Sequence, residues 1–360
     1  MSFLTLAHHG YEWRIMKTAN DIYNWYEGKH VLVTGAAGFV GSAIAERLHY
    51  HGAKVFATVR DYDPVRPFFN REVWPRFIEA TITGDLTDYD VASRAVAESE
   101  PDVIFHLAAM SQVRHCARLP RLNYESNIMG AVNIMESVRT QSAGSAIVIA
   151  SSDKAYGEPV EYPVKDSTPF NPVHPYDAAK ASVDIIAQSY ARYYKMPIGI
   201  TRCGNIYGPG DVNWQRLIPG TLRDLLYHRR PVIRSDGLST RDYNYIEDIV
   251  EAYARVGVAY GQPFFFGPKI FGPGGTWIIT SEMNHSVLDI VNMCRLAIPW
   301  GAEIEPDIRG TATDETKLLP LDGTKFTKDF GWRIRTDTQD GIDITVEWLM
   351  TYLGEGLADD

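Results

Sequence analysis

The fold is decided by the stretch His30-Val31-Leu32-Val33-Thr34-Gly35-Ala36-Ala37-Gly38-Phe39-Val40-Gly41. Its first five residues form the short apolar run of a buried strand, and residues 42–51 place apolar side chains at helical spacing. A glycine-rich turn between a strand and a helix is the context of a dinucleotide-binding fingerprint. Gly35 would allow the tight turn, Gly38 would let the backbone approach a pyrophosphate, and Gly41 would let helix and strand pack closely. A purely structural glycine turn is the less favoured alternative.

Strands and helices alternate after this turn. Strands are predicted at 54–59, 81–86, within 101–109 (a strand together with the loop after it), 146–150 and 195–202; helices are predicted at 91–99, 123–139 and 286–295. This alternation predicts an α/β fold, a Rossmann-type doubly wound parallel sheet with a smaller, mostly C-terminal α/β domain that binds substrate.

Three segments are expected along the chain. They are an N-terminal extension (1–28), a dinucleotide-binding Rossmann domain (29–202) to which later elements contribute, and a mainly substrate-binding part (203–360). The family resemblance described below implies NAD and a nucleotide sugar as the ligands of the last two segments. Residues 20–26 form either a short helix that docks its aromatic side chains or a loosely ordered lead-in. Residues 261–276, rich in glycine, proline and phenylalanine, are a lid, an oligomer contact or an inserted loop.

The end of the second predicted strand bears on the choice of cofactor. Arg60 and Asp61 follow this strand, about 20 residues beyond the glycines. An acid at this place binds the adenosine ribose of NAD, whereas a basic group suits the extra phosphate of NADP. We predict NAD through Asp61, with NADP possible because of Arg60. A pair of solvated turn charges is the alternative.

Polar groups converge where the strand 146–150 ends. Ser151-Ser152-Asp153-Lys154 follows this strand directly, and Tyr176 and Lys180 lie four residues apart, on one face of a predicted helix. A tyrosine hydroxyl has a pKa near 10, and a nearby ammonium group lowers that pKa. Tyr176 could then take a proton from a substrate hydroxyl while hydride leaves the same carbon, and Ser152 would bind that oxygen. A Ser152/Tyr176/Lys180 oxidoreductase triad is therefore favoured over a structural role.

The GxxGxxG spacing of the glycines, together with Tyr176-xxx-Lys180, resembles the extended short-chain dehydrogenase/reductase superfamily, and the resemblance covers roughly residues 28–352. It implies that an asparagine, Asn127, steadies Lys180 through water. It also implies a homodimer formed by the two long helices that carry Asn127 and Tyr176. The cofactor-binding residues that it implies are Gly35, Gly38, Phe39, Val40, Gly41, Asp61, Asp85, Leu86, Leu107, Ala108, Ala109, Tyr176 and Lys180.

The pair Asp153-Lys154 narrows the activity. A 4,6-dehydratase oxidises a sugar at C4, removes the acidified C5 proton, eliminates the C6 hydroxyl as water and returns hydride to C6. It therefore needs an acid and a base beside the triad. The chain resembles nucleotide-sugar 4,6-dehydratases, most of which carry Asp-Glu here, and its Ser-Asp-Lys-Ala-Tyr is most similar to CDP-glucose 4,6-dehydratases. Asp153 would be the acid if burial raises its pKa.

The role of Lys154 stays open at the level of sequence. It is the C5 base only if burial or neighbouring cations such as Lys180 strongly depress its pKa. Otherwise it orients Asp153 or stabilises the enolate, and another group or water takes the C5 proton. A solvated ammonium at the rim is the structural alternative.

The C-terminal half supplies candidates for substrate binding. Thr201-Arg202-Cys203-Gly204-Asn205-Ile206-Tyr207-Gly208 also resembles the dehydratases, where the asparagine reaches the substrate phosphates. Arginines on short polar loops suit a pyrophosphate because a guanidinium donates two parallel hydrogen bonds. The predicted substrate-binding residues are Asn205, Arg216, Arg234 and Arg241.

Composition bounds the remaining possibilities. The 360 residues carry a net charge of −10, which argues against nucleic acid or an anionic membrane as partner. The three cysteines lack metal-ligand or disulfide-framework spacing, so we expect no metal and a cytoplasmic protein. No apolar run is long enough to span a membrane. The alternatives to a dehydratase are a nucleotide-sugar 4-epimerase, a dehydratase for another sugar, and a non-catalytic dinucleotide sensor.

Overall fold

The computed structural model describes residues 18–61, 74–142, 144–262, 265–266, 271–310 and 319–357. Most of the predicted N-terminal extension and parts of the segment 261–276 lie outside these residues. Within the described ranges, none of the helices combines the length and the apolar character that a membrane span requires.

A seven-stranded parallel sheet forms the centre of the larger lobe, in the order β10-β6-β5-β4-β1-β2-β3. The order runs outward from β1 in both directions, which confirms the predicted doubly wound fold. The strands are β1 (His30–Thr34), β2 (Lys54–Val59), β3 (Ala80–Thr83), β4 (Val103–His106), β5 (Ala146–Ala150), β6 (Ile198–Cys203) and β10 (Gly275–Ile279).

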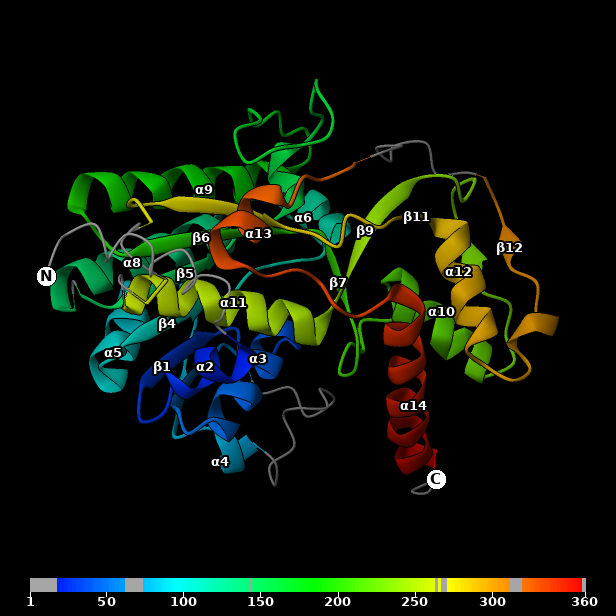
Figure 1. Cartoon of the computed structure of the whole chain (residues 1–360), viewed down its shortest axis with the longest axis horizontal. Helices are drawn as coiled ribbons and strands as arrows, with labels where there is room; N and C mark the ends of the chain where they lie inside the picture. Colours follow the sequence, from blue (N-terminus) through cyan, green and yellow to red (C-terminus); the bar gives the residue numbers. More distant parts are fainter. Residues whose placement is uncertain are drawn as a thin grey trace, which may run out of the picture.

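Helices cover both faces of this sheet because alternate side chains of each strand point to opposite faces. Val31 and Val33 belong to one apolar cluster, and Leu32 between them belongs to another. The first cluster contains side chains of α3 (Phe39–Tyr50) and α11 (Ile246–Gly261). The second contains side chains of α5 (Tyr89–Ser99), α8 (Gly130–Gln141) and α9 (Pro175–Tyr194). The result is a three-layer α/β/α arrangement (Figure 1).

The helix predicted over 123–139 is interrupted. It is built from α7 (Pro120–Tyr124), a π-helical turn (Glu125–Met129) and α8. Asn127 lies in the π-helical turn and is buried. Such turns insert one extra residue into an α-helix and have no periodicity signal that a short sequence window reveals.

The short helix α2 (Ala19–Asn24) is docked on the larger lobe. Thr18 and Asp21 form a capping box at its start. Tyr26, just beyond its end, is fully buried and donates a hydrogen bond of 2.7 Å to the carbonyl oxygen of Ala254 in α11. The structure therefore confirms the first of the two interpretations of residues 20–26, a short helix docked through its aromatic side chains.

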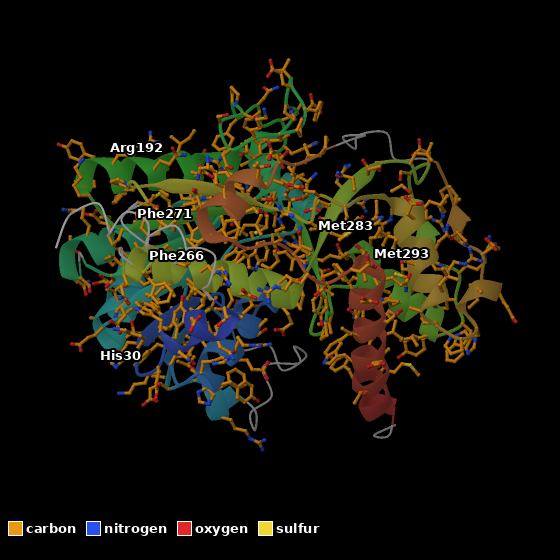
Figure 2. The ribbon with its side chains drawn as sticks, viewed as in Figure 1. His30, Arg192, Phe266, Phe271, Met283 and Met293 are labelled. Atoms are coloured by element: carbon orange, nitrogen blue, oxygen red, sulfur yellow. The ribbon has the colours of Figure 1, made fainter. Side chains whose placement is uncertain are left out.

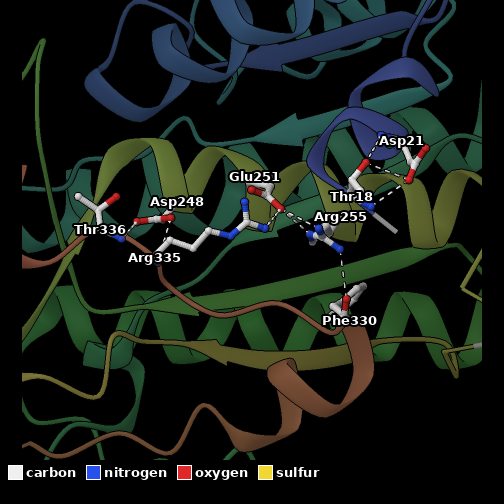
Figure 3. A network of polar contacts seen from close by, with 8 residues as sticks. All are labelled: Thr18, Asp21, Asp248, Glu251, Arg255, Phe330, Arg335 and Thr336. Atoms are coloured by element: carbon white, nitrogen blue, oxygen red, sulfur yellow. Dashed lines mark hydrogen bonds and ion pairs between the residues drawn. The ribbon is translucent and has the colours of Figure 1, made fainter. Parts of the chain in front are cut away.

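A polar network ties α11 to the segment that precedes the last helix (Figure 3). Arg255 donates to Glu251 over 2.7 Å and to the carbonyl oxygen of Phe330 over 3.2 Å. Arg335 reaches the same glutamate over 3.3 Å, and Asp248 accepts from the backbone N–H of Thr336 over 3.1 Å. Because Arg255 and Glu251 are buried, this network holds the C-terminal segment firmly against the larger lobe.

The smaller lobe holds two short sheets and three helices, grouped at the right of Figure 1. Figure 2 labels Met283 and Met293 there, away from His30 and Phe266 in the larger lobe. β10 and α11 follow residue 202 but belong to the larger lobe, so later elements do contribute to it. The smaller lobe contains β7 (Asn205–Tyr207), β8 (Val232–Ile233), β9 (Thr240–Tyr245), β11 (Asn284–Ser286), β12 (Asp307–Ile308), α10 (Leu217–Leu226), α12 (Val287–Leu296) and α14 (Thr338–Leu357).

Three short helices complete the structure: α4 (Trp74–Phe77), α6 (Val113–Arg118) and α13 (Thr324–Phe330). The described part of the segment 261–276 packs near α13. Phe266 lies 5.2 Å from Phe330 and 6.2 Å from Phe271 between ring centroids. Phe266 is almost fully buried, so this part of the segment is core packing.

Candidate functional site

The glycine turn after β1 is built for close backbone contacts. Gly35 has φ +69°, and a Cβ atom there would lie 2.8 Å from the backbone nitrogen of Ala108. A Cβ atom on Gly41 would lie 2.3 Å from the carbonyl oxygen of Gly35. The predicted tight turn and close helix packing are therefore both present. Gly38 is the N-cap of α3, so this helix directs its N-terminus at the turn.

The loop after β4 is fastened to this turn. The Thr34 hydroxyl oxygen accepts hydrogen bonds from the backbone N–H groups of Leu107 and Ala108, over 3.1 and 3.2 Å. The same hydroxyl lies 3.0 Å from Nδ1 of His106. Burial lowers the pKa of His106 to about 3, with a smaller contribution from Lys180. A neutral His106 at neutral pH fits a structural histidine.

One cavity of about 1670 Å³ opens along the carboxyl ends of the strands and contains every predicted site residue. A cradle of small residues at one end and arginines at the other fits a dinucleotide beside a nucleotide sugar. The residues predicted to bind the cofactor all line this cavity: Gly35, Gly38, Phe39, Val40, Gly41, Asp61, Asp85, Leu86, Leu107, Ala108, Ala109, Tyr176 and Lys180. The catalytic and substrate candidates that line it are Ser152, Asp153, Lys154, Asn205, Arg216, Arg234 and Arg241.

Arg60 and Asp61 lie together at the end of β2. Arg60 Nε is 2.5 Å from Asp61 Oδ2, and both side chains are exposed on the cavity wall. The aspartate that favours NAD and the arginine that would favour NADP thus neutralise each other in the free protein.

The polar groups after β5 are ordered by short hydrogen bonds. Ser152 caps a 3-10 turn, Asp153–Tyr156, and donates to Asp153 Oδ1 over 2.9 Å. The backbone N–H of Lys154 also donates to Asp153 Oδ1, over 2.8 Å. Asp153 is buried and Lys154 is half-buried. The turn therefore presents a carboxylate and an ammonium group side by side at the end of the central strand.

Lys180 is held from β5. Its Nζ donates to the carbonyl oxygen of Ala150 over 2.7 Å and lies 6.0 Å from the ring centroid of Tyr176. Burial lowers the pKa of Lys180 to about 8, while Cys116 and Asp184 act in the opposite direction. The ammonium form is therefore less favoured here than in water.

The expectation for the Tyr176 pKa requires a correction. Lys180 was expected to lower it, but in the protein alone burial raises the pKa of Tyr176 well above 10, and the negative charge of Asp153 adds to this. A hydrogen bond with Ser152 and the charge of Arg216 oppose the rise. Desolvation wins because the phenolate is the charged form and the ring is buried.

Asn127 does not contact Lys180 directly. Its Oδ1 accepts from the backbone N–H of Met110 over 2.6 Å, and its Nδ2 donates to Asn123 over 2.8 Å. Asn123 in turn donates to the carbonyl oxygen of Pro175 over 2.9 Å. The pair of asparagines thus joins the loop after β4 to the start of α9. The water-mediated role in steadying Lys180 stays a prediction.

The substrate-side arginines come from different elements. Arg216 precedes α10 and pairs with the buried Asp211 over 3.1 Å. Arg234 follows β8, and Arg241 lies in β9, where it donates to the carbonyl oxygen of Thr240 over 2.7 Å. Asn205 lies in β7. Their assignment to substrate phosphates stays a prediction, although all four share the cavity.

Sequence reasoning missed cavity residues that adjoin the motifs. Asp177 and His174 flank the tyrosine at the start of α9, and Arg114 and His115 belong to α6. The acidic residue Asp177 inside the Tyr-xxx-Lys motif could have been noticed in the sequence. Helical periodicity alone does not predict whether its side chain lines the cavity.

Known proteins match this chain over most of its length. The model of the NAD dependent epimerase/dehydratase family matches residues 31–262. A UDP-glucose 4-epimerase of Mycolicibacterium smegmatis is 30% identical over 322 residues, 88% of this chain and 97% of that protein. A CDP-glucose 4,6-dehydratase of Salmonella typhimurium is 27% identical over 343 residues, 90% of this chain and 91% of that protein.

The fold is shared with solved structures. The structure of a UDP-glucose 4-epimerase from Thermotoga maritima matches with a TM-score of 0.79 at 24% identity, covering 90% of this chain and 99% of that one. The matching family model confirms NAD as the predicted cofactor. The predicted superfamily resemblance is confirmed at this level: the chain belongs to the NAD-dependent epimerase/dehydratase family.

Proposed function

We propose that the protein is a nucleotide-hexose 4,6-dehydratase, acting on CDP-glucose or a related nucleoside diphosphate glucose. The observation that carries this proposal is the Asp153-Lys154 turn beside Ser152 and Tyr176 in one cavity. Oxidation and re-reduction of one carbon need only Ser152, Tyr176 and Lys180. The additional acid and cation have a proton-transfer or charge-stabilising task only if water is eliminated.

The residues divide the chemistry between them. NAD, when bound, supplies the hydride acceptor and donor. Tyr176 would take the proton of the C4 hydroxyl, and Ser152, which hydrogen-bonds with Tyr176, would hold that oxygen. Asp153, buried and already bonded to Ser152, would protonate the C6 hydroxyl as it leaves. Asn205, Arg216, Arg234 and Arg241 would bind the pyrophosphate.

A 4-epimerase is the second candidate. The UDP-glucose 4-epimerase, at 30% identity over 88% of the chain, favours it, since the CDP-glucose 4,6-dehydratase is 27% identical over 90% of the chain. An epimerase uses the same cofactor and tyrosine but leaves the mass of the sugar unchanged. The acid and cation after Ser152 would then serve only to position the sugar.

Product analysis separates the two functions. Purified protein is incubated with CDP-, UDP-, GDP- and dTDP-glucose, and the products are analysed by mass spectrometry. The dehydratase forms a 4-keto-6-deoxy sugar that has lost one water, and we expect this with CDP-glucose above all. A product of unchanged mass and inverted C4 would instead establish the epimerase. No change with any of the four would contradict both.

We also propose a homodimer built on α7, the π-helical turn and α9. These elements pack against each other and expose apolar side chains. Leu122, Met129 and Ile185 are 40%, 45% and 57% exposed. Apolar side chains gathered on adjoining helices are typical of a surface that a partner covers.

A further inference from the structure

Asp177 is a buried carboxylate at the cavity that the mechanism above leaves unused. It lies next to Tyr176 at the start of α9, with only 4% of its surface exposed. Its Oδ1 is buried and has no hydrogen-bond partner among the residues that the structure describes. A buried polar atom without a partner costs free energy, so its retention requires an explanation.

The charged groups around Asp177 come from two elements. Burial raises its pKa, and the charge of Asp153 in the 3-10 turn adds to this. Lys154 from the same turn, His174 and a hydrogen bond from the His174 backbone act in the opposite direction. Helix α6 also packs on α9, but its Cys116 acts on Lys180 and Tyr176. Asp177 therefore lies within electrostatic range of Asp153 and Lys154, the two residues of the turn that the proposed dehydration uses.

Lys154 is poorly suited to remove a proton. A lysine in its ammonium form has three N–H donors and no lone pair to accept a proton. Asp153 is engaged through its Oδ1 with Ser152 and the Lys154 backbone. Asp177 keeps one carboxylate oxygen without a hydrogen-bond partner, and burial raises its pKa, so it is a stronger base than a carboxylate in water.

We propose that Asp177 is the base that removes the C5 proton during dehydration, and that the Lys154 ammonium stabilises the resulting enolate. This inference rests on the proposed dehydratase function. It places the basic carboxylate on α9 instead of at residue 154.

The step balances within the site. The C5–H bond breaks, its proton goes to Asp177, and its electron pair forms the C4–C5 double bond of an enolate that carries its charge on the C4 oxygen. The C4 carbonyl then re-forms, and the electron pair between C4 and C5 becomes the C5–C6 double bond. The C6–O bond breaks, and the oxygen takes the proton of Asp153 and leaves as water. When C6 later receives hydride, C5 regains a proton from Asp177. The proton that Tyr176 took from the C4 hydroxyl resets Asp153 through solvent, so the sugar loses one water in total.

The first test is Asp177→Asn, which keeps the shape of the side chain but removes the base. With CDP-glucose as substrate, we expect about a hundredfold or greater loss of the dehydrated product, the scale of losing a general base. Oxidation at C4 does not need this base, so absorbance at 340 nm from reduced cofactor should still appear in a single turnover. In D2O the wild type places deuterium at C5, whereas substrate recovered from the variant should contain none.

Asp289→Asn is the matched control. Asp289 is also the third residue of a helix, where it caps α12 away from the cavity. The thermal unfolding temperature of both variants is measured. A loss of product in Asp177→Asn that exceeds any shared loss of stability then comes from the missing carboxylate. Asp289→Asn should leave product formation and C5 exchange unchanged.

A second variant shows whether a loss of activity in Asp177→Asn comes from misfolding. Lys154→Glu in the Asp177→Asn background supplies a new carboxylate on the neighbouring 3-10 turn, and we expect it to restore exchange of the C5 hydrogen with solvent. Lys154→Met alone should slow dehydration because the enolate loses its cation. It should still exchange the C5 hydrogen with solvent because Asp177 is present. If Asp177→Asn dehydrates at the wild-type rate, or if Lys154→Met alone abolishes exchange, Asp177 is not the base. If the wild type forms no dehydrated product at all, the proposed function fails and this inference falls with it.

Discussion

Burial sets the acid–base behaviour of single residues at this site. It raises the pKa of Tyr176 and of Asp177 and lowers the pKa of Lys180 to about 8. In each case the charged form is the one that loses hydration. The free protein thus holds its tyrosine protonated, and deprotonation requires positive charge brought to the ring when ligands bind.

Removal of the tyrosine hydroxyl tests its role directly. Tyr176→Phe should reduce turnover by about a hundredfold or more, because the C4 proton then has no acceptor. Binding of NAD, measured by calorimetry, should change little, because the ring still fills its place. Tyr190→Phe, on the same helix but hydrogen-bonded to Glu136, is the control and should keep full activity. Retained turnover in Tyr176→Phe would remove Tyr176 from this role.

Lys180 makes the stability of the free protein depend on pH. Its pKa is lowered from 10.5 to about 8. A lysine whose pKa is lower in the folded state than in the unfolded state stabilises the fold fully above pH 10.5, and this stabilisation is lost as pH falls through about 8. Between pH 8 and 10.5, the free energy of unfolding of the wild type should therefore rise by about 3 kcal/mol relative to that of Lys180→Met. This follows from about 1.36 kcal/mol for each unit of the pKa shift. Urea denaturation of both proteins across this range measures the gain, and a constant difference would contradict it.

At the scale of elements, α9 is the part that assembles the site, and a buried ion pair holds it. Arg202 at the end of β6 donates to Asp184 of α9 through Nε over 2.8 Å and Nη2 over 2.7 Å. The same guanidinium donates to the Tyr156 hydroxyl over 2.7 Å, just after the Asp153-Lys154 turn. One arginine thus orients both segments that carry the predicted catalytic residues.

Breaking this pair should be costly. Asp184→Asn leaves the Arg202 charge buried without its counterion, so the free energy of unfolding should fall by about 3–5 kcal/mol. Glu125→Gln is the matched control, because it breaks an exposed pair with Arg121. That change should cost less than about 1 kcal/mol. Equal losses of stability in the two variants, measured by urea denaturation, would show that the buried pair is no stronger than a surface pair.

At the scale of the whole molecule, the two lobes form the cavity and the long helices form the proposed dimer surface. The larger lobe contributes the glycine turn and α9, and the smaller lobe contributes the arginines. The network around Arg255 anchors the chain between them. A dimer through α7 and α9 would also brace the helix that carries Tyr176.

A charge on this surface should separate the protomers. Ile185→Glu places a carboxylate in the proposed interface, where an unpaired charge is poorly tolerated. We expect light scattering to show a monomer for this variant and a dimer for the wild type. Ile344→Glu, an exposed isoleucine on α14, is the control and should remain dimeric. If the mass in solution is the same for wild type and Ile185→Glu, the interface lies elsewhere.

The sequence by itself determined the doubly wound sheet, the glycine turn and the meeting of the predicted site residues along one cavity. These depend on local patterns: the apolar run 30–34, the spacing of Gly35 and Gly41, and the places where strands end in polar residues. Parallel strands bring their carboxyl ends to one edge of a sheet, so such residues meet whatever the rest of the chain does.

Only the tertiary structure decided the chemistry of the individual groups. The pairing of Arg202 with Asp184, the π-helical turn around Asn127 and the entry of Asp177 into the cavity wall depend on segments far apart in the chain. The rise in the Tyr176 pKa was missed because a sequence motif records which charge is near but not how much water is lost. Desolvation is a property of the packed molecule, since it depends on every neighbour that covers the group.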